Sequence, residues 1–208
     1  MHQLENKVFP SVEPFKDKAY RISETLAGLI PTGSGIFKSL VNSPYEARLE
    51  SWISDATSAI NYLIDEEGLN LEQLQKNEMF MDFVINLSNT AARTSQKEKI
   101  QYLQKALVGA AKIKIEDKDE YNFYLSTLDF FSALHLRTLV QFVDIKIKEN
   151  EIPTLFEDYQ QKSYIYDQAI NDIKARSLLM FENDDNYGTD VFLSKQGSKF
   201  LEILGIKT

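Results

Sequence analysis

The chain has 208 residues, of which 43% are hydrophobic and 12% aromatic, enough to fill the core of one ordinary domain or two small ones. Its formal net charge of −8 argues against non-specific binding to nucleic acid, because phosphates attract basic surfaces. With no cysteine and only two histidines, the sequence excludes disulfides, thiolate catalysis and metal centres rich in cysteine or histidine.

The first predicted element is a helix over residues 14–30, which Pro31 and Gly33 end. A short helical turn over residues 36–41 follows. Gly28 and Gly33 have the spacing of a phosphate loop, but the lysine of that motif comes too late, at Lys38. We therefore interpret residues 26–41 as a tight turn between helices. The alternative is a hairpin that enters a bilayer interface through its apolar side chains, namely Leu29, Ile30, Ile36 and Phe37.

Helix-start signals recur along the middle of the chain. Ser43 and Pro44 begin a helix whose apolar residues are spaced three and four apart, and Gly68 ends it. Asn77 is positioned to cap the next helix. Two capping boxes open two more helices, one formed by Ser95 and Glu98 and the other by Asp117 and Glu120. Short connections between these helices predict an antiparallel helical bundle.

The last third of the sequence predicts helices together with one hairpin. The helices are expected over residues 133–148, 155–160 and 163–179. Two apolar stretches, residues 180–181 and 189–193, flank a polar turn and predict a short β-hairpin. Ser194 caps a final helix that Gly205 ends. The sequence thus predicts a mainly α protein, with a helical bundle over residues 1–131 and a winged helix-turn-helix over residues 132–208.

DNA binding is the obvious function of a winged helix, with residues 163–179 as the recognition helix. The candidate contact residues are Lys162, Tyr164, Gln168, Asn171, Lys174 and Arg176. However, residues 150–208 hold ten acidic and six basic residues, and Glu182, Asp184 and Asp185 lie in the predicted wing. Such a surface repels phosphates, so we favour a scaffold or dimerisation unit over DNA binding.

No residue pattern indicates an enzyme. His135 lies near a predicted helix start, but its sequence neighbours supply neither a nucleophile motif nor a carboxylate partner. We interpret it as a solvated or hydrogen-bonded residue of a first helical turn, and we assign no catalytic residue, metal ligand or cofactor. A secretion signal and a membrane-spanning apolar run are both missing, so we expect a cytoplasmic protein.

Four segments of the middle region follow one another in a familiar order: residues 89–94, 99–107, 123–128 and 132–139. They form a helix with small residues, a helix ending in a small-residue stretch, and a helix leading into a leucine-x-x-leucine core helix. In this order residues 80–143, about a third of the chain, resemble the abortive-infection alpha family of bacterial phage-defence proteins. The resemblance implies a defence or toxin-associated role and brings no catalytic residue with it.

Three functions from different classes follow. The first is a non-enzymatic, bacterial protein-interaction module with an unidentified protein partner, a second copy of the chain included. The alternative is a winged-helix transcriptional regulator that binds DNA. The third is an effector that acts on membranes through residues 26–41.

Overall fold

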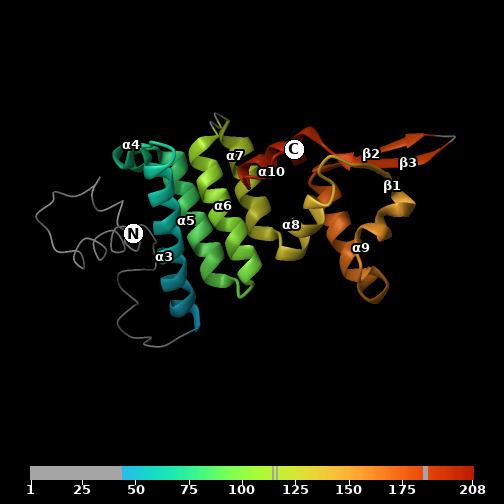
Figure 1. Ribbon diagram of the computed structural model, residues 1–208, viewed down its shortest axis with the longest axis horizontal. Helices are drawn as coiled ribbons and strands as arrows, with labels where there is room; N and C mark the ends of the chain where they lie inside the picture. Colours follow the sequence, from blue (N-terminus) through green and yellow to red (C-terminus); the bar gives the residue numbers. More distant parts are fainter. Residues whose placement is uncertain (1–43, 114, 116, 185–186) are drawn as a thin grey trace, which may run out of the picture. The chain divides into compact units, whose positions relative to one another are not determined.

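The computed structural model of the protein describes residues 44–113, 115, 117–184 and 187–208. The chain divides into two compact units, an N-terminal unit (Met1–Asp129) and a C-terminal unit (Phe130–Thr208). The described residues are mainly helical, as predicted, and a small antiparallel sheet lies in the C-terminal unit (Figure 1). No helix among them has the length and apolar character needed to cross a membrane. The elements predicted over residues 14–30 and 36–41 lie outside the described residues, and so do the apolar side chains expected to enter a bilayer interface, namely Leu29, Ile30, Ile36 and Phe37.

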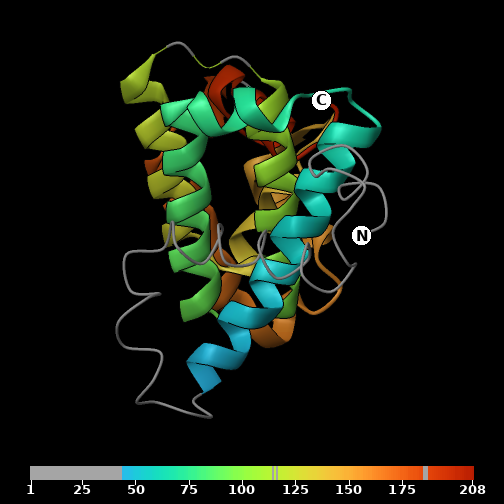
Figure 2. The same cartoon turned by 90° about the vertical axis from the view of Figure 1, so that its left-hand side faces the viewer.

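The described part of the N-terminal unit is helical. Its helices are α3 (Pro44–Asp65), α4 (Leu71–Lys76), α5 (Glu78–Arg93), α6 (Lys97–Lys112) and α7 (Lys118–Phe130). Helices α3, α5 and α6 run alongside and contact one another (Figure 2). Helix α7 lies beside α5, and the ring centres of Tyr121 on α7 and Phe83 on α5 are 5.5 Å apart. Trp52, Phe83, Leu103, Leu107 and Tyr124 fill the core between them and are almost fully buried.

Two long-range hydrogen bonds show how these helices are directed. The Nε of Arg48, near the start of α3, donates to the carbonyl oxygen of Ala92, near the end of α5, at 2.8 Å. The Nζ of Lys99, near the start of α6, donates to the carbonyl oxygen of Asp129, near the end of α7, at 2.9 Å. Each pair is therefore antiparallel, as in a bundle whose helices are joined by short connections.

Two predicted helix starts of this unit are confirmed and one is wrong, and Ser43, predicted to begin α3, lies outside the described residues. Asn77 caps α5, since its Oδ1 accepts the Phe80 N–H at 3.1 Å, and Asp117 accepts N–H groups of the first turn of α7. The predicted capping box of Ser95 and Glu98 is wrong. Helix α6 begins at Lys97, and Thr94 Oγ1 accepts the Gln96 N–H at 3.2 Å instead. The short helix α4 was not predicted.

The C-terminal unit combines helices with a three-stranded sheet. In chain order its elements are α8 (Ala133–Val140), β1 (Lys146–Lys148), the 3-10 helix η1 (Glu149–Leu155), α9 (Tyr159–Ala175), β2 (Leu179–Asp184), β3 (Gly188–Leu193) and α10 (Lys195–Ile203). The strand order is β1-β3-β2 and both pairings are antiparallel. Phe131, Leu136, Phe142, Ile173 and Phe200 form its core and are fully buried.

Three predicted helices of this unit are placed differently. The helix over residues 133–148 ends at Val140, and Lys146–Lys148 pairs with β3 as a strand. The chain leaves the helix through Asp144, whose φ of 56° no helix accommodates. The helix predicted over residues 155–160 lies earlier, as η1. Helix α9 begins before Ser163, bends at Lys162, where φ is −133°, and ends before Ser177, where φ is 55°.

The hairpin and the last helix match the sequence pattern. Strands β2 and β3 contain both predicted apolar stretches, and Gly188 at the turn has a φ of 81°, which favours glycine. Ser194 caps α10, since its Oγ accepts the Gly197 N–H at 2.8 Å. The Ser194 N–H also donates to the Leu178 carbonyl oxygen at 3.0 Å, which fixes α10 against the end of α9.

Candidate functional site

Beside the exposed charged residues Asp167 and Lys174, the solvent-exposed side of helix α9 carries five uncharged side chains. They recur at helical spacing and are all exposed, and we call them the α9 face: Gln160, Gln161, Tyr164, Gln168 and Asn171. Tyr164 is 74% exposed, and Ile165 at the edge of the face is 36% exposed. The opposite side of α9, with Tyr166, Ala169, Ile170 and Ile173, is buried in the unit. Three of the predicted DNA-contact residues, Tyr164, Gln168 and Asn171, thus share one exposed face.

The basic residues predicted to contact DNA are held by partners inside the unit. Lys162 forms an ion pair with Asp158 at 2.5 Å. The Nζ of Lys174 lies 3.8 Å from the centre of the Phe181 ring, and the guanidinium of Arg176 lies 4.8 Å from the centre of the Phe130 ring. A phosphate would have to displace these ion-pair and cation–π contacts to bind the basic groups.

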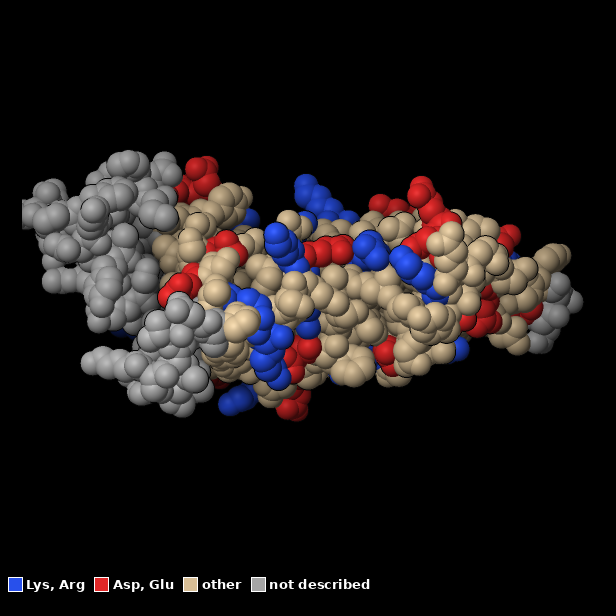
Figure 3. All heavy atoms as spheres, turned by 90° about the horizontal axis from the view of Figure 1, so that it is seen from below, with Lys and Arg blue, Asp and Glu red and all other residues tan. Residues whose placement is uncertain are grey.

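The lysines of the sheet are engaged in the same way. Lys146 forms ion pairs with Asp190 at 3.2 Å and with Glu182 at 3.3 Å, and Lys148 with Asp190 at 2.6 Å. The hydrogen bond to Asp190 raises the pKa of Lys146, and the hydrogen bond from Lys148 lowers the pKa of Asp190. On the face drawn in Figure 3, basic and acidic side chains stand next to one another rather than in patches of one sign.

The acidic residues of α9 and its start also have partners. Asp158 accepts hydrogen bonds from Lys162 and, at 2.6 Å, from the hydroxyl of Tyr166, and the bond from Lys162 is the main cause of its lowered pKa. The Tyr159 hydroxyl donates to Asp167. The five side chains of the α9 face are thus neutral, and the exposed carboxylate of Asp167 lies next to them on the same helix.

His135 has partners that its local sequence did not reveal. Its Nδ1 accepts hydrogen bonds from the Oγ and the N–H of Ser132, at 2.7 and 3.3 Å, so its Nε2 carries the proton and donates to Asp172 at 3.1 Å. The ring also stacks on Phe131 with centres 5.0 Å apart. Asp172 lies 37 residues away in the sequence. The arrangement closes the first turn of α8 and ties that helix to α9.

Replacing Asp172 by asparagine is expected to destabilise the C-terminal unit by about 1 kcal/mol near pH 6, and by less near pH 3. The hydrogen bond with His135 is the main cause that lowers the pKa of Asp172. A carboxyl group whose pKa is lowered by folding stabilises the protein above its ordinary pKa of about 3.9, and this contribution is lost as the pH falls through the lowered value. Urea unfolding of both proteins at the two pH values measures the difference. An equal loss at both would contradict this role for the carboxylate.

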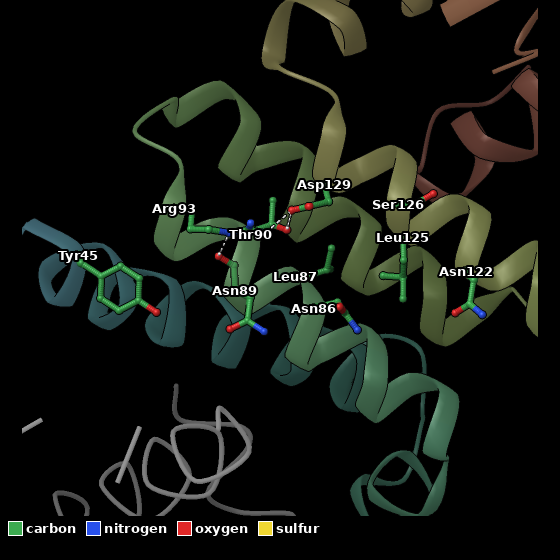
Figure 4. Close-up of a pocket in the computed structure, with 10 residues that line it drawn as sticks. All are labelled: Tyr45, Asn86, Leu87, Asn89, Thr90, Arg93, Asn122, Leu125, Ser126 and Asp129. Atoms are coloured by element: carbon green, nitrogen blue, oxygen red, sulfur yellow. Dashed lines mark hydrogen bonds and ion pairs between the residues drawn. The ribbon is translucent and has the colours of Figure 1, made fainter. Parts of the chain in front are cut away.

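A second candidate site is a groove in the N-terminal unit, with a volume of about 600 Å³. Its residues come from three helices and are mostly polar: Tyr45, Asn86, Leu87, Asn89, Thr90, Arg93, Asn122, Leu125, Ser126 and Asp129. Figure 4 shows α5 and α7 supplying its two walls. The sequence pattern did not predict it, although Asn86 and Asn89 on α5, and Asn122 and Ser126 on α7, already have same-face spacing.

Among the residues that the structure describes, no three histidine or acidic side chains are grouped so that they could hold a metal ion. Comparison of the chain with family models, with curated proteins and with solved structures found no match.

Proposed function

We propose that the C-terminal unit is a winged helix-turn-helix that binds a protein partner through the α9 face. The order of a helix, a strand, a helical turn, a second helix and a hairpin supports this assignment, with η1 as the middle helical element. So does the strand order, which places β3 between β1 and β2. In this arrangement α9 corresponds to the recognition helix and the β2–β3 hairpin to the wing.

The composition of the exposed surface favours a protein partner. Among the described residues six large hydrophobic side chains are exposed, and five of them lie in the C-terminal unit. Four of these five lie on α9 or on the hairpin: Tyr164, Ile165, Met180 and Tyr187. The central parts of protein interfaces are enriched in tyrosine and methionine and depleted of charge. The α9 face, with an exposed tyrosine among neutral amides, has this character.

The proposal depends chiefly on the contacts that the basic residues make within the unit. Lys162, Lys174 and Arg176, on or directly after α9, each contact a carboxylate or an aromatic ring of the same unit. DNA binding gains most of its free energy when free cations displace the counterions of phosphates. A recognition helix whose cations already have partners gains little from counterion release. Binding to a neutral protein surface does not require free cations.

The change Tyr164→Asp is expected to abolish capture of the partner, because it places a charge at the centre of the α9 face. Affinity purification of the tagged full-length chain from its native host, followed by mass spectrometry, compares the variant with the wild type. Tyr62→Asp is the matched control, since Tyr62 is 45% exposed and lies on α3 of the other unit. A protein that is captured equally by the wild type and both variants would not be a ligand of α9.

The resemblance of residues 80–143 supports one further element of this proposal, a role of the partner complex in phage defence. We expect phage to plaque more efficiently on a host that lacks the gene, and the gene for the Tyr164→Asp variant not to restore resistance. Restoration by that variant would separate defence from the α9 face.

A further inference from the structure

The groove between α5 and α7 has a repeat that matches an extended peptide. On α5 Asn86 and Thr90 lie four residues apart, and on α7 so do Asn122 and Ser126. Four residues of α-helix advance about 6 Å. Every second residue of an extended chain advances about 6.6 Å, and its amide groups face the same side at that interval. Polar groups on both walls can therefore meet successive amides of a strand that lies along the groove.

The side chains of the walls have the chemistry that a peptide backbone requires. Each carboxamide presents a donor and an acceptor side by side, as a peptide N–H and C=O do. Asn86 uses its Nδ2 to donate to the Asp82 carbonyl oxygen at 2.8 Å, which directs its Oδ1 away as an acceptor. The side-chain amides of Asn89 and Asn122 have no hydrogen-bond partner among the described residues. Leu87 and Leu125 also line the groove and supply apolar contact for the ligand.

One end of the groove can accept a carboxylate. There the Nη2 of Arg93 donates to Asp129, and its Nε donates to the Asn89 carbonyl oxygen at 3.2 Å. Thr90 Oγ1 donates to the same carboxylate at 2.7 Å. A guanidinium has five N–H groups, so Arg93, whose side chain is 62% exposed, keeps further donors beside its ion pair with Asp129. A ligand carboxylate would accept these directed hydrogen bonds, a contact that does not depend on the counterion release that drives binding to DNA.

We infer that this groove binds a short peptide in extended conformation, with its C-terminal carboxylate at Arg93. The distance from Asn86 to Arg93, seven residues of helix, is about 10 Å, which suits three to four extended residues. A groove of about 600 Å³ is within the range of small-ligand sites. Contacts to the backbone make recognition largely independent of the peptide's side chains. This site is separate from the α9 face and does not depend on the function proposed for it.

Titration of the full-length chain, labelled with ¹⁵N at its asparagine side chains, with acetyl-tetraalanine tests this inference. We expect the side-chain amide signals of Asn86, Asn89 and Asn122 to shift in a saturable way, while that of exposed Asn150, on η1, stays unchanged. Asn122→Ala should weaken binding about tenfold, as expected for loss of a hydrogen-bonded amide pair, and Asn150→Ala should not. Arg93→Gln should remove the preference for the free acid over the C-terminal amide.

Three outcomes would overturn the inference. They are the absence of saturable shifts, equal weakening by Asn122→Ala and Asn150→Ala, and shifts that maltotriose produces but the peptide does not. The last would identify the groove as a saccharide site. A retained preference for the free acid in Arg93→Gln would refute the placement of the carboxylate. Because Asn122 and Asn150 are both exposed, neither variant is expected to unfold the chain.

Discussion

The change Trp52→Ala is expected to destabilise the N-terminal unit by about 3–5 kcal/mol, the largest effect that we predict there. Trp52 is 1% exposed on α3, so its removal leaves a cavity that the surrounding helices fill only in part. Its Nε1–H donates to Ser88 Oγ on α5 at 2.7 Å, and Ser88 Oγ donates in turn to the Val84 carbonyl oxygen at 2.6 Å. The alanine variant loses both the packing and this link between α3 and α5.

Urea unfolding followed by circular dichroism measures this loss. Ser54→Ala is the matched control, because Ser54 is exposed on the same helix and its replacement should change the unfolding free energy by less than about 0.5 kcal/mol. Trp52→Phe should cost less than Trp52→Ala, since it keeps most of the apolar volume and removes the hydrogen bond to Ser88. A cost of less than about 1 kcal/mol for Trp52→Ala would show that Trp52 is not buried as described.

Gly197→Ala is expected to have the largest effect in the C-terminal unit. A Cβ atom at Gly197 would lie 2.1 Å from the carbonyl oxygen of Leu178, far inside van der Waals contact, and 3.1 Å from Cδ1 of Leu193. The carbonyl group is backbone and already accepts the N–H of Ser194, the residue that caps α10, so it cannot move without disturbing this hydrogen bond. We expect a cost of about 3 kcal/mol or more, at the upper end of overpacking effects.

Hydrogen exchange measured by mass spectrometry locates this effect. We expect faster exchange in β2, β3 and α10 of Gly197→Ala than in the wild type, because α10 loses its contact with the end of α9. Ser198→Ala, the next position on α10, is the control and should leave the exchange nearly unchanged. Unaltered protection in the Gly197→Ala variant would mean that α10 does not pack closely on Leu178.

The sequence predicts those elements whose signals are local. The start of α5 at Asn77, the start of α10 at Ser194 and the β2–β3 hairpin each depend on residues within one or two turns of each other. Strand β1 was missed for the opposite reason. Its three residues, Lys146–Lys148, continue a helical pattern, and only pairing with β3, more than forty residues later, makes them a strand.

The same contrast applies to the candidate sites. Helical spacing alone placed Tyr164, Gln168 and Asn171 on one exposed face. It did not show that Lys174 lies over Phe181 or that Arg176 lies over Phe130, because these contacts join residues that only the fold brings together. The His135 pair with Asp172 and the groove between α5 and α7 are likewise tertiary. The sequence suggested that Lys174 and Arg176 are available to contact DNA, but in the fold both already contact aromatic rings of the same unit.

Fluorescence anisotropy of labelled duplex DNA, titrated with the full-length chain at low salt, tests most directly whether α9 is a protein-binding or a DNA-binding helix. Because Lys162, Lys174 and Arg176 of the proposed recognition helix have intramolecular partners, we predict no saturable binding to random or native promoter DNA at micromolar protein. Saturable binding that weakens with salt, and weakens further in Lys174→Ala and Arg176→Ala, would contradict the proposal and assign α9 to DNA.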